Sequence, residues 1–312
     1  MTDRRGAEPV ISAAGLSKRY GAVTAVAGVS LEVARGEIFG IVGPNGAGKT
    51  TTIEMMQGLR RPDGGTVQVL GLDPQRDVGE IRQRVGTQLQ NAVLPDRMRV
   101  WEALDLYASY YASPADPQAL LDAWDLRDKR TSSFDSLSGG QRQRLLIALA
   151  LIGSPELVFL DELTTGLDPQ ARRLTWDHVR TIRDGGVTVV LVTHFMDEAE
   201  ALCDRIAVID GGRIAALDTP SVLASRAGPT RRVRFTAPGN FATHWLSDIA
   251  ELERIDRRGA TVVVTGTGPL LARVATALAA HGAAPDDLTV EHANLEDAFL
   301  AITTPSVQSR RV

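Results

Sequence analysis

A glycine-rich segment near the start of the chain has the residue types that bind phosphate. Residues 43–50 read GPNGAGKT, which fits GxxxxGK[ST], follow an apolar run and precede a helical pattern. The glycines let backbone N–H groups converge on phosphate oxygens, aided by the positive end of the helix dipole. We expect Lys49 to reach the β and γ phosphates and Thr50 to place its hydroxyl on Mg²⁺. The expected nucleotide contacts are Gly43, Pro44, Asn45, Gly46, Ala47, Gly48, Lys49, Thr50 and Thr51.

An acidic pair ends a second apolar run, LVFLDE at 157–162. In a parallel sheet, this position lies at the carboxyl edge where ligands bind, so Asp161 is expected to serve Mg²⁺. Glu162 is then left to orient and deprotonate water. The alternative is a carboxylate that caps the next turn, but two adjacent charges at a buried edge are costly without a cation nearby.

A second segment suited to anions reads LSGGQRQR at 137–144. Ser138 can cap the following helix, while Gly139 and Gly140 expose its first N–H groups, so the helix end is a good phosphate ligand. By itself this pattern is also compatible with an ordinary capped helix.

Composition excludes several classes of protein. The 312 residues include 34 basic and 38 acidic side chains, a net charge of −4, which gives no general attraction to nucleic acid or anionic lipid. One cysteine, Cys203, cannot form an internal disulfide or a cysteine metal cluster, and we expect it to be a buried helix residue. The start, MTDRRGAEPV, does not resemble a secretory signal, and no apolar run approaches membrane-spanning length.

The elements that must position these residues follow an α/β pattern. Nearly unbroken apolar runs at 36–43, 156–162 and 186–193 predict strands of a parallel sheet that is covered on both faces. Helical patterns occupy 49–59, 169–185 and 196–204. A mostly helical subdomain is expected at about 93–153, between the first two of those strands.

The last part of the chain predicts a separate small domain. A hairpin is expected at Gly211–Gly212, and SRAGPTRR at 225–232 has the composition of a linker. Beyond it the order strand, helix, strand, strand, helix, strand indicates a small ferredoxin-like α+β domain, followed by a helix that Asn294 caps. We expect domains at 1–226 and 227–312.

Together, GPNGAGKTT, LSGGQRQR and LVFLDE resemble the nucleotide-binding subunit of the ABC transporter family over roughly residues 10–220. The resemblance implies ATP and Mg²⁺ as ligands, ATP hydrolysis and an ATP-dependent homodimer. In this family the LSGG segment binds the γ-phosphate held by the other subunit, so Ser138, Gly139, Gly140 and Gln141 become expected nucleotide contacts.

The resemblance also implies roles for four further residues. Tyr20 stacks on adenine, Asp168 crosses the dimer interface and His194 contacts the γ-phosphate and the catalytic water. Gln90 joins Mg²⁺ to the helical subdomain, with Gln88 as the competing choice. The chain departs from the family at Leu163, where proline usually follows the catalytic glutamate. The other histidines, 178, 244, 281 and 292, are expected to be surface or packing residues.

The C-terminal domain, ending in NLEDAFLAI, resembles that of daunorubicin-resistance-type exporter ATPases. This implies a peripheral subunit on the cytoplasmic face of the membrane that powers separately encoded permease chains, with drug, antibiotic or lipid-like substrates and no nucleic acid. The alternative is a non-transport or regulatory soluble ABC ATPase. A DNA-repair ATPase of this family would need a long coiled-coil insertion or two cassettes, and the sequence has neither.

Overall fold

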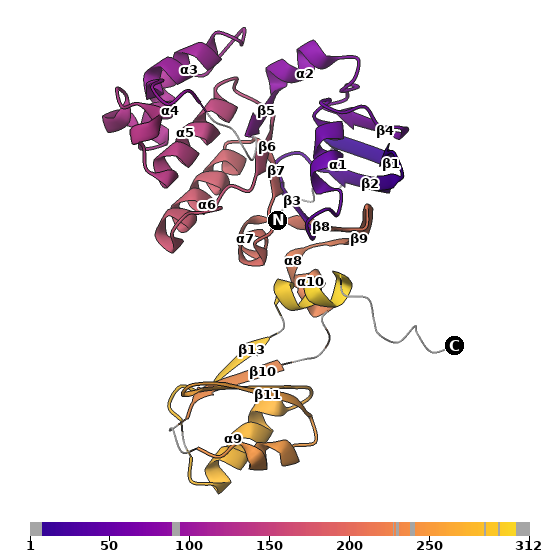
Figure 1. The fold of residues 1–312 in the computed structure, drawn as a ribbon, viewed down its shortest axis with the longest axis vertical. Helices are drawn as coiled ribbons and strands as arrows, with labels where there is room; N and C mark the ends of the chain where they lie inside the picture. Colours follow the sequence, from indigo (N-terminus) through magenta and orange to yellow (C-terminus); the bar gives the residue numbers. More distant parts are fainter. Residues whose placement is uncertain are drawn as a thin grey trace. The chain divides into compact units, whose positions relative to one another are not determined.

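A computed structural model describes residues 8–88, 94–226, 228, 231–237, 241–283, 285–292 and 294–303 (Figure 1). The chain divides into two compact units, residues 1–220 and 221–312. The boundary that we expect after residue 226 lies slightly further along the chain. Among the helices in the described ranges, none has both the length and the apolar character to span a bilayer.

The first unit contains a six-stranded sheet that explains the apolar runs. Its order is β5-β6-β7-β3-β8-β9, parallel except for β9. Every residue of β3 and β7 is buried, as two-faced coverage requires. The hairpin between β8 and β9 is at Gly211–Gly212, as predicted. The strands are β3 (Ile38–Val42), β5 (Val85–Gln88), β6 (Leu157–Asp161), β7 (Thr188–Val192), β8 (Arg205–Asp210) and β9 (Arg213–Asp218).

Capping residues, proline and glycine set the ends of the helices of this unit. Helix α6 (Pro169–Asp184) starts at Asp168, whose carboxylate accepts hydrogen bonds from the N–H groups of Gln170 and Ala171. Pro169 occupies its first turn, where a missing N–H costs nothing. Helix α1 (Lys49–Met56) is shorter than predicted because the chain turns at Gly58, with φ of +73°. Helices α2 (Val78–Arg84) and α7 (Met196–Leu202) complete the set.

The first unit also contains a three-stranded antiparallel sheet, which was not predicted from the sequence. It consists of β1 (Ile11–Tyr20), β2 (Val23–Val33) and β4 (Gly64–Val69), in the order β2-β1-β4. Its strands β1 and β2 precede β3 in the chain, and β4 follows α1. Register shifts break the regular alternation of β1, so the period-2 signal is weak there. Its inward side chains share one core with β3, β6 and α1.

The predicted helical region contains α3 (Val100–Ala108), α4 (Pro117–Ala123) and α5 (Gly139–Leu151), with short 3₁₀ turns η1 (Arg127–Lys129) and η2 (Phe134–Ser136). Trp124, at the end of α4, packs edge-on against His178 of α6, with ring centroids 4.6 Å apart. His178 is therefore a packing residue, as expected.

The second unit holds a four-stranded antiparallel sheet in the order β11-β12-β10-β13. The first helix of the expected order, placed at FATHWLSDIAEL (241–252), is wrong: only a short 3₁₀ helix forms there. Thr243, Ser247 and Asp248 explain this, since such side chains compete with helical backbone hydrogen bonds. The elements are α8 (Pro220–Ser225), β10 (Arg231–Thr236), η3 (His244–Asp248), β11 (Leu252–Arg258), β12 (Thr261–Gly266), α9 (Leu270–Ala280), β13 (Thr289–His292) and α10 (Leu295–Thr303).

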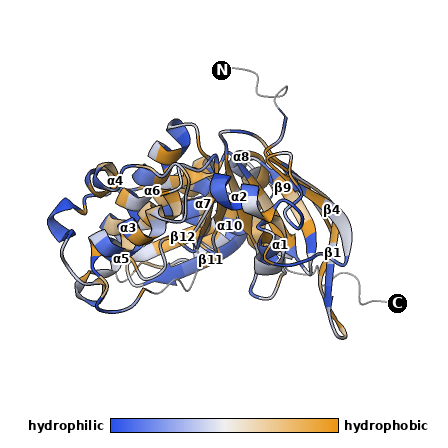
Figure 2. Ribbon diagram, turned by 90° about the horizontal axis from the view of Figure 1, so that it is seen from above, coloured by the Kyte–Doolittle hydropathy of each residue, from blue (hydrophilic) through white to orange (hydrophobic). Residues whose placement is uncertain are grey.

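Strand β11 forms an edge of this sheet and reads LERIDRR. It is largely hydrophilic in Figure 2. Charged side chains on an edge strand discourage pairing with another chain, so the unpaired backbone of β11 is protected against aggregation.

Candidate functional site

The glycine-rich loop leaves the end of β3 and enters α1 through backbone that glycine alone adopts easily. Gly46 and Gly48 have φ of +78° and +97°, and Gly48 is the N-cap of α1. At Gly43, an added Cβ would lie 2.1 Å from the carbonyl oxygen of Ile209. Glycine at these positions is therefore required by backbone angle or by contact, and the N–H groups at the start of α1 are left available to an anion.

Lys49 is held inside this loop. Its Nζ donates hydrogen bonds to the carbonyl oxygens of Gly43, at 2.8 Å, and Pro44, at 3.0 Å. Burial lowers the pKa of Lys49, while the nearby carboxylates of Glu162 and Asp161 act in the opposite direction. The ammonium group is thus oriented by the loop and faces two acidic neighbours.

One cavity joins the loop to the acidic pair, with a volume of about 310 Å³. This is the lower end of the range for small-molecule sites in proteins. It is lined by Ala25, Asn45, Gly46, Ala47, Gly48, Lys49, Thr50, Thr51, Asp161, Glu162 and Val192. Most of the predicted phosphate loop and both predicted carboxylates therefore meet in a single cavity.

The two carboxylates repel each other at the carboxyl end of β6. Burial, followed by the charge of Glu162, raises the pKa of Asp161 to about 6, and Lys49 lowers it in part. A half-buried pair of this kind favours a bound cation, because the cation removes the repulsion. Among the described residues no group of three or more His, Cys, Asp and Glu could hold a metal alone. One carboxylate and a hydroxyl beside a phosphate site fit Mg²⁺, which takes its other ligands from phosphate and water.

His194 follows β7, and its side chain reaches Glu162. The distance from His194 Nδ1 to Glu162 Oε1 is 3.3 Å. Glu162 itself has φ of +50°, and its N–H donates to the carbonyl oxygen of Val192 at 2.9 Å. Leu163, where the resemblance leads one to expect proline, is fully buried and anchors the loop by packing.

Of the two candidate glutamines, the structure describes only Gln88, which was the competing choice. Gln90 lies outside the described residues. Gln88 is buried at the end of β5, and its Oε1 accepts a hydrogen bond from the N–H of Asp161 at 3.2 Å. It lines an adjoining cavity of about 270 Å³ with Thr50 and Asp161.

The LSGG segment is not part of this cavity. Ser138 caps α5 through a reciprocal pair of bonds: its hydroxyl accepts from the N–H of Gln141 at 3.3 Å, and Gln141 Oε1 accepts from the N–H of Ser138 at 3.0 Å. The nearest atom to a Cβ added at Gly139 is 4.0 Å away, and at Gly140 it is 3.7 Å away. Within the described ranges, crowding therefore requires neither glycine.

Tyr20 and Asp168 also lie outside the lining of the cavity. Tyr20 ends β1, is 42% exposed and has the guanidinium of Arg60 over its ring at 5.2 Å from the centroid. The Oδ1 atom of Asp168 accepts both capping hydrogen bonds of α6. Their predicted contacts, with adenine and across a dimer interface, stay predictions.

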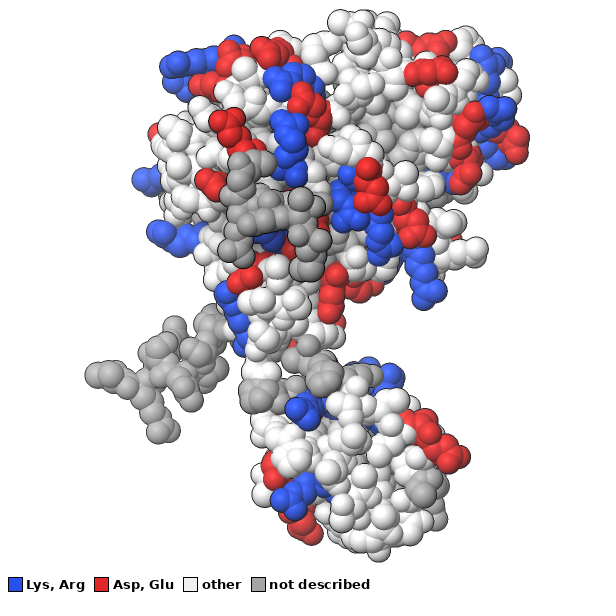
Figure 3. All heavy atoms as spheres, turned by 180° about the vertical axis from the view of Figure 1, so that it is seen from behind, with Lys and Arg blue, Asp and Glu red and all other residues white. Residues whose placement is uncertain are grey.

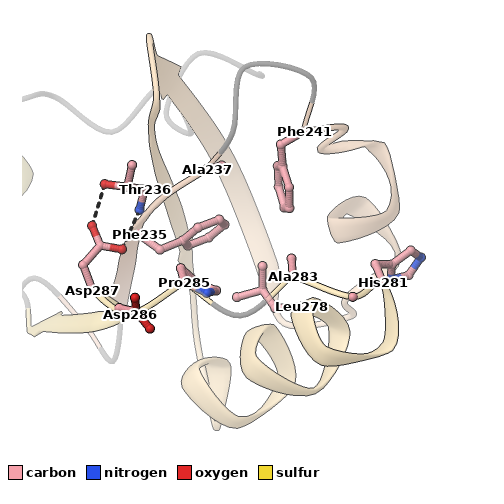
Figure 4. Close-up of a pocket in the computed structure, with 11 residues that line it drawn as sticks. Phe235, Thr236, Ala237, Phe241, Leu278, His281, Ala283, Pro285, Asp286 and Asp287 are labelled. Atoms are coloured by element: carbon pink, nitrogen blue, oxygen red, sulfur yellow. Dashed lines mark hydrogen bonds between the residues drawn. The ribbon is translucent and has the colours of Figure 1, made fainter.

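The second unit has a cavity of its own, of about 810 Å³ (Figure 4). Its floor includes Phe235 and Phe241, and at its margin Asp287 accepts hydrogen bonds from the N–H and hydroxyl of Thr236. It contains none of the residues predicted to bind nucleotide.

On the face of the first unit drawn in Figure 3, acidic and basic side chains are interspersed.

A phosphate loop at the turn from β3 to α1, facing an acidic pair on β6 and a histidine after β7, defines a P-loop ATPase. A family model described as ABC transporter matches residues 26–165. The chain is 39% identical over 306 residues to the Nod factor export ATP-binding protein I of Ralstonia nicotianae, covering 96% of this chain and 95% of that protein. It is 37% identical over 305 residues to the daunorubicin resistance ATP-binding protein DrrA3 of Streptomyces coeruleorubidus, covering 95% and 96%.

A solved ATP-binding subunit of an ABC transporter matches with a TM-score of 0.63 and 28% identity, over 69% of this chain and 91% of that one. The chain belongs to the ABC transporter family of ATP-binding proteins, and it binds and hydrolyses ATP. The family and activity expected from the three motifs are confirmed.

Proposed function

We propose that the chain is the ATP-hydrolysing subunit of an exporter, acting as a homodimer on the cytoplasmic face of the membrane and powering separate permease chains. Support comes from relatives that match nearly the whole chain and are named for export of Nod factor or for daunorubicin resistance. Drug, antibiotic or lipid-like compounds are the proposed substrate class, in accord with those names.

Within the cavity, Lys49 binds the β and γ phosphates through its ammonium group, and the N–H groups of the loop bind the remaining phosphate oxygens. Thr50 and Asp161 would hold Mg²⁺, and Gln88 lines the adjoining cavity with both of them. The family resemblance gives Gln90 the same task. When bound, the cation neutralises charge that develops on the transferred phosphoryl group.

Glu162 acts as the general base. Its carboxylate lies at the margin of the cavity, where it can accept a proton from the attacking water. His194, 3.3 Å away, fixes the orientation of that carboxylate and contacts the γ-phosphate. Glu162 thus activates the water, and His194 positions the phosphate that the water attacks.

The observation that carries the dimer proposal is the pair of glycines at the start of α5, which the packing around them does not require. Glycine in a helix costs up to about 1 kcal/mol relative to alanine, yet none of the residues that the structure describes crowds Gly139 or Gly140. A ligand that approaches from outside explains their small size. In a homodimer this ligand is the γ-phosphate in the partner's loop, with Ser138 and Gln141 beside it and Asp168 at the interface.

A mixing experiment tests the shared site. Gly140→Asp places a carboxylate against the γ-phosphate, and Lys49→Ala removes the phosphate-binding ammonium, so each variant alone should be nearly inactive. A mixed dimer has one composite site with both changes and one with neither. An equimolar mixture should therefore recover about a quarter of the normal ATPase rate. No recovery, although mixed dimers form, would exclude the shared site.

The transport role is tested separately from catalysis. The chain should co-purify with membrane-spanning partners, and its ATPase rate should change when they are present. A non-transport or regulatory ATPase would hydrolyse ATP normally and stay free of membranes in the same preparation.

A further inference from the structure

Helix α7 carries three acidic side chains, of which one is buried. Asp197 and Glu200 are exposed, whereas Glu198 is 0% exposed. Carboxylates are almost never fully buried unless they are paired, and no lysine or arginine is bonded to Glu198 in the part of the chain that the structure describes. Folding alone does not require an acid at this position, since a leucine or methionine would pack there without the cost of desolvation.

The polar neighbours of Glu198 come from three separate segments. Its Oε1 accepts a hydrogen bond from the indole N–H of Trp176, on α6, at 3.2 Å. Burial raises the pKa of Glu198, and the hydroxyls of Thr193 and Thr164 offset this in part, ahead of the Trp176 N–H. Both threonines are themselves fully buried. The carboxylate is thus hydrogen-bonded to α6, and two threonine hydroxyls from two separate loops lie near enough to affect its pKa.

The two threonines sit next to the hydrolytic pair in the sequence. Thr193 immediately precedes His194, and its hydroxyl also accepts a hydrogen bond from the N–H of Phe195 at 3.0 Å, which folds the chain around His194. Thr164 lies two residues after Glu162. The two hydroxyls that affect the pKa of Glu198 therefore belong to the two segments whose spacing sets the 3.3 Å separation of Glu162 and His194.

The backbone at Glu162 needs such support. Its φ of +50° lies in the left-handed region, which a non-glycine residue keeps only when its surroundings hold it. Two buried atoms in this cluster, Glu198 Oε2 and Thr164 Oγ1, have no hydrogen-bond partner within the described residues.

We propose that Glu198 is a positioning residue for ATP hydrolysis, which holds the loops of Glu162 and His194 at their working separation through Thr164, Thr193 and Trp176. It does not touch the nucleotide. This inference rests on the proposed roles of Glu162 and His194.

The test compares variants of the full chain by two readouts, kcat for ATP and the Kd of ATP measured by calorimetry. Glu198→Ala should lower kcat on the order of 10²-fold, as small misplacements of catalytic groups do, with Kd little changed. Glu198→Gln keeps the shape and an acceptor for Trp176, so it should retain most of the activity. Glu200→Ala, on the same helix but exposed, is the matched control and should behave like the unaltered chain.

Two further comparisons keep the outcome decisive. In a Glu162→Gln chain, Glu198→Ala should cause no further loss of kcat, because its effect acts through Glu162. If instead Glu162→Gln keeps normal turnover, the proposed general base fails, whatever Glu198 does.

A second variant applies if Glu198→Ala does not fold. Thr164→Val removes the hydroxyl beside Glu198 and leaves the carboxylate in place, so it should lower kcat with little change in Kd. A normal kcat in Thr164→Val, or a fall in kcat that only follows the loss of folded protein, would overturn the proposal.

Discussion

At the scale of single residues, the site places two carboxylates beside one ammonium group in the described part of the chain, so negative charge there exceeds positive. Asp161 and Glu162 are adjacent, and the one ammonium that acts on both in the described structure belongs to Lys49. Burial and like charge are unfavourable for Asp161 at neutral pH, so the site stores free energy that a cation and phosphate release on binding.

Asp161→Asn should therefore stabilise the nucleotide-free chain at pH 7.5 while abolishing ATPase activity. The pKa of Asp161 is about 6 in the folded chain and 3.8 ordinarily, so the folded state binds the extra proton between these values. The contribution of Asp161 to the free energy of unfolding therefore falls as pH rises from 3.8 through about 6. The gain should approach about 3 kcal/mol at pH 7.5 and vanish near pH 4. Urea unfolding at both pH values measures it, with exposed Asp105→Asn as control.

Glu162→Gln should preserve ATP binding and lose turnover. The amide keeps the size of the side chain but cannot take a proton from water, and a general base contributes about 10² to 10⁴ in rate. Calorimetry should give a normal Kd, and size-exclusion chromatography should show an ATP-bound dimer that accumulates. Near-normal turnover would rule out Glu162 as the base.

At the scale of elements, the strands of the central sheet bring the chemistry together. In the order β6-β7-β3, the acidic pair, His194 and the phosphate loop follow three neighbouring carboxyl ends. Helix α5 is different, because its capped start lies apart from the cavity and has space around both glycines. Its sequence is thus explained by an external ligand more readily than by its own packing.

Gly139→Ala should test that distinction without adding charge. Because a Cβ fits there and alanine favours helix, the Tm should be unchanged or rise by an amount worth up to about 1 kcal/mol. ATPase activity should nevertheless fall, since the methyl group occupies the approach to the helix N-terminus. Gly86→Ala is the contrasting variant: its Cβ would lie 2.0 Å from the carbonyl oxygen of Ala150, so it should destabilise the fold. Normal activity in Gly139→Ala would argue for a simple helix cap.

At the scale of the whole molecule, the chain is two compact units with separate hydrophobic cores. The core of the second unit is built on β10, β12 and α9 and includes Phe235 and Leu246. A core of its own means that this unit does not need the first to bury its apolar residues.

A chain shortened after Arg226 should therefore stay folded and bind ATP with the affinity of the full chain. This end point is the domain boundary expected from the sequence, and it keeps α8 whole. Calorimetry with ATP and a thermal melt measure the result. Loss of solubility or of nucleotide binding in the shortened chain would show that the second unit supports the first.

The sequence by itself determined the local chemistry. The glycines and Lys49 of the phosphate loop, the acidic pair, the cap at Ser138 and the start of α6 at Pro169 depend on neighbours within a few residues. Backbone angles, capping and periodicity act over that range, so these features could be read without a fold.

Tertiary structure alone decided what depends on distant pairing and on burial. The sheet of β1, β2 and β4 escaped prediction because register shifts in β1 weaken its alternation. The predicted helix after Phe241 is a separate case, an error of local interpretation, because Thr243 and its neighbours compete for the backbone of their own segment. Glu198 is the clearest case: DEAE reads as an exposed acidic helix, and only the packing of α7 against α6 and the two catalytic loops removes one of its carboxylates from water.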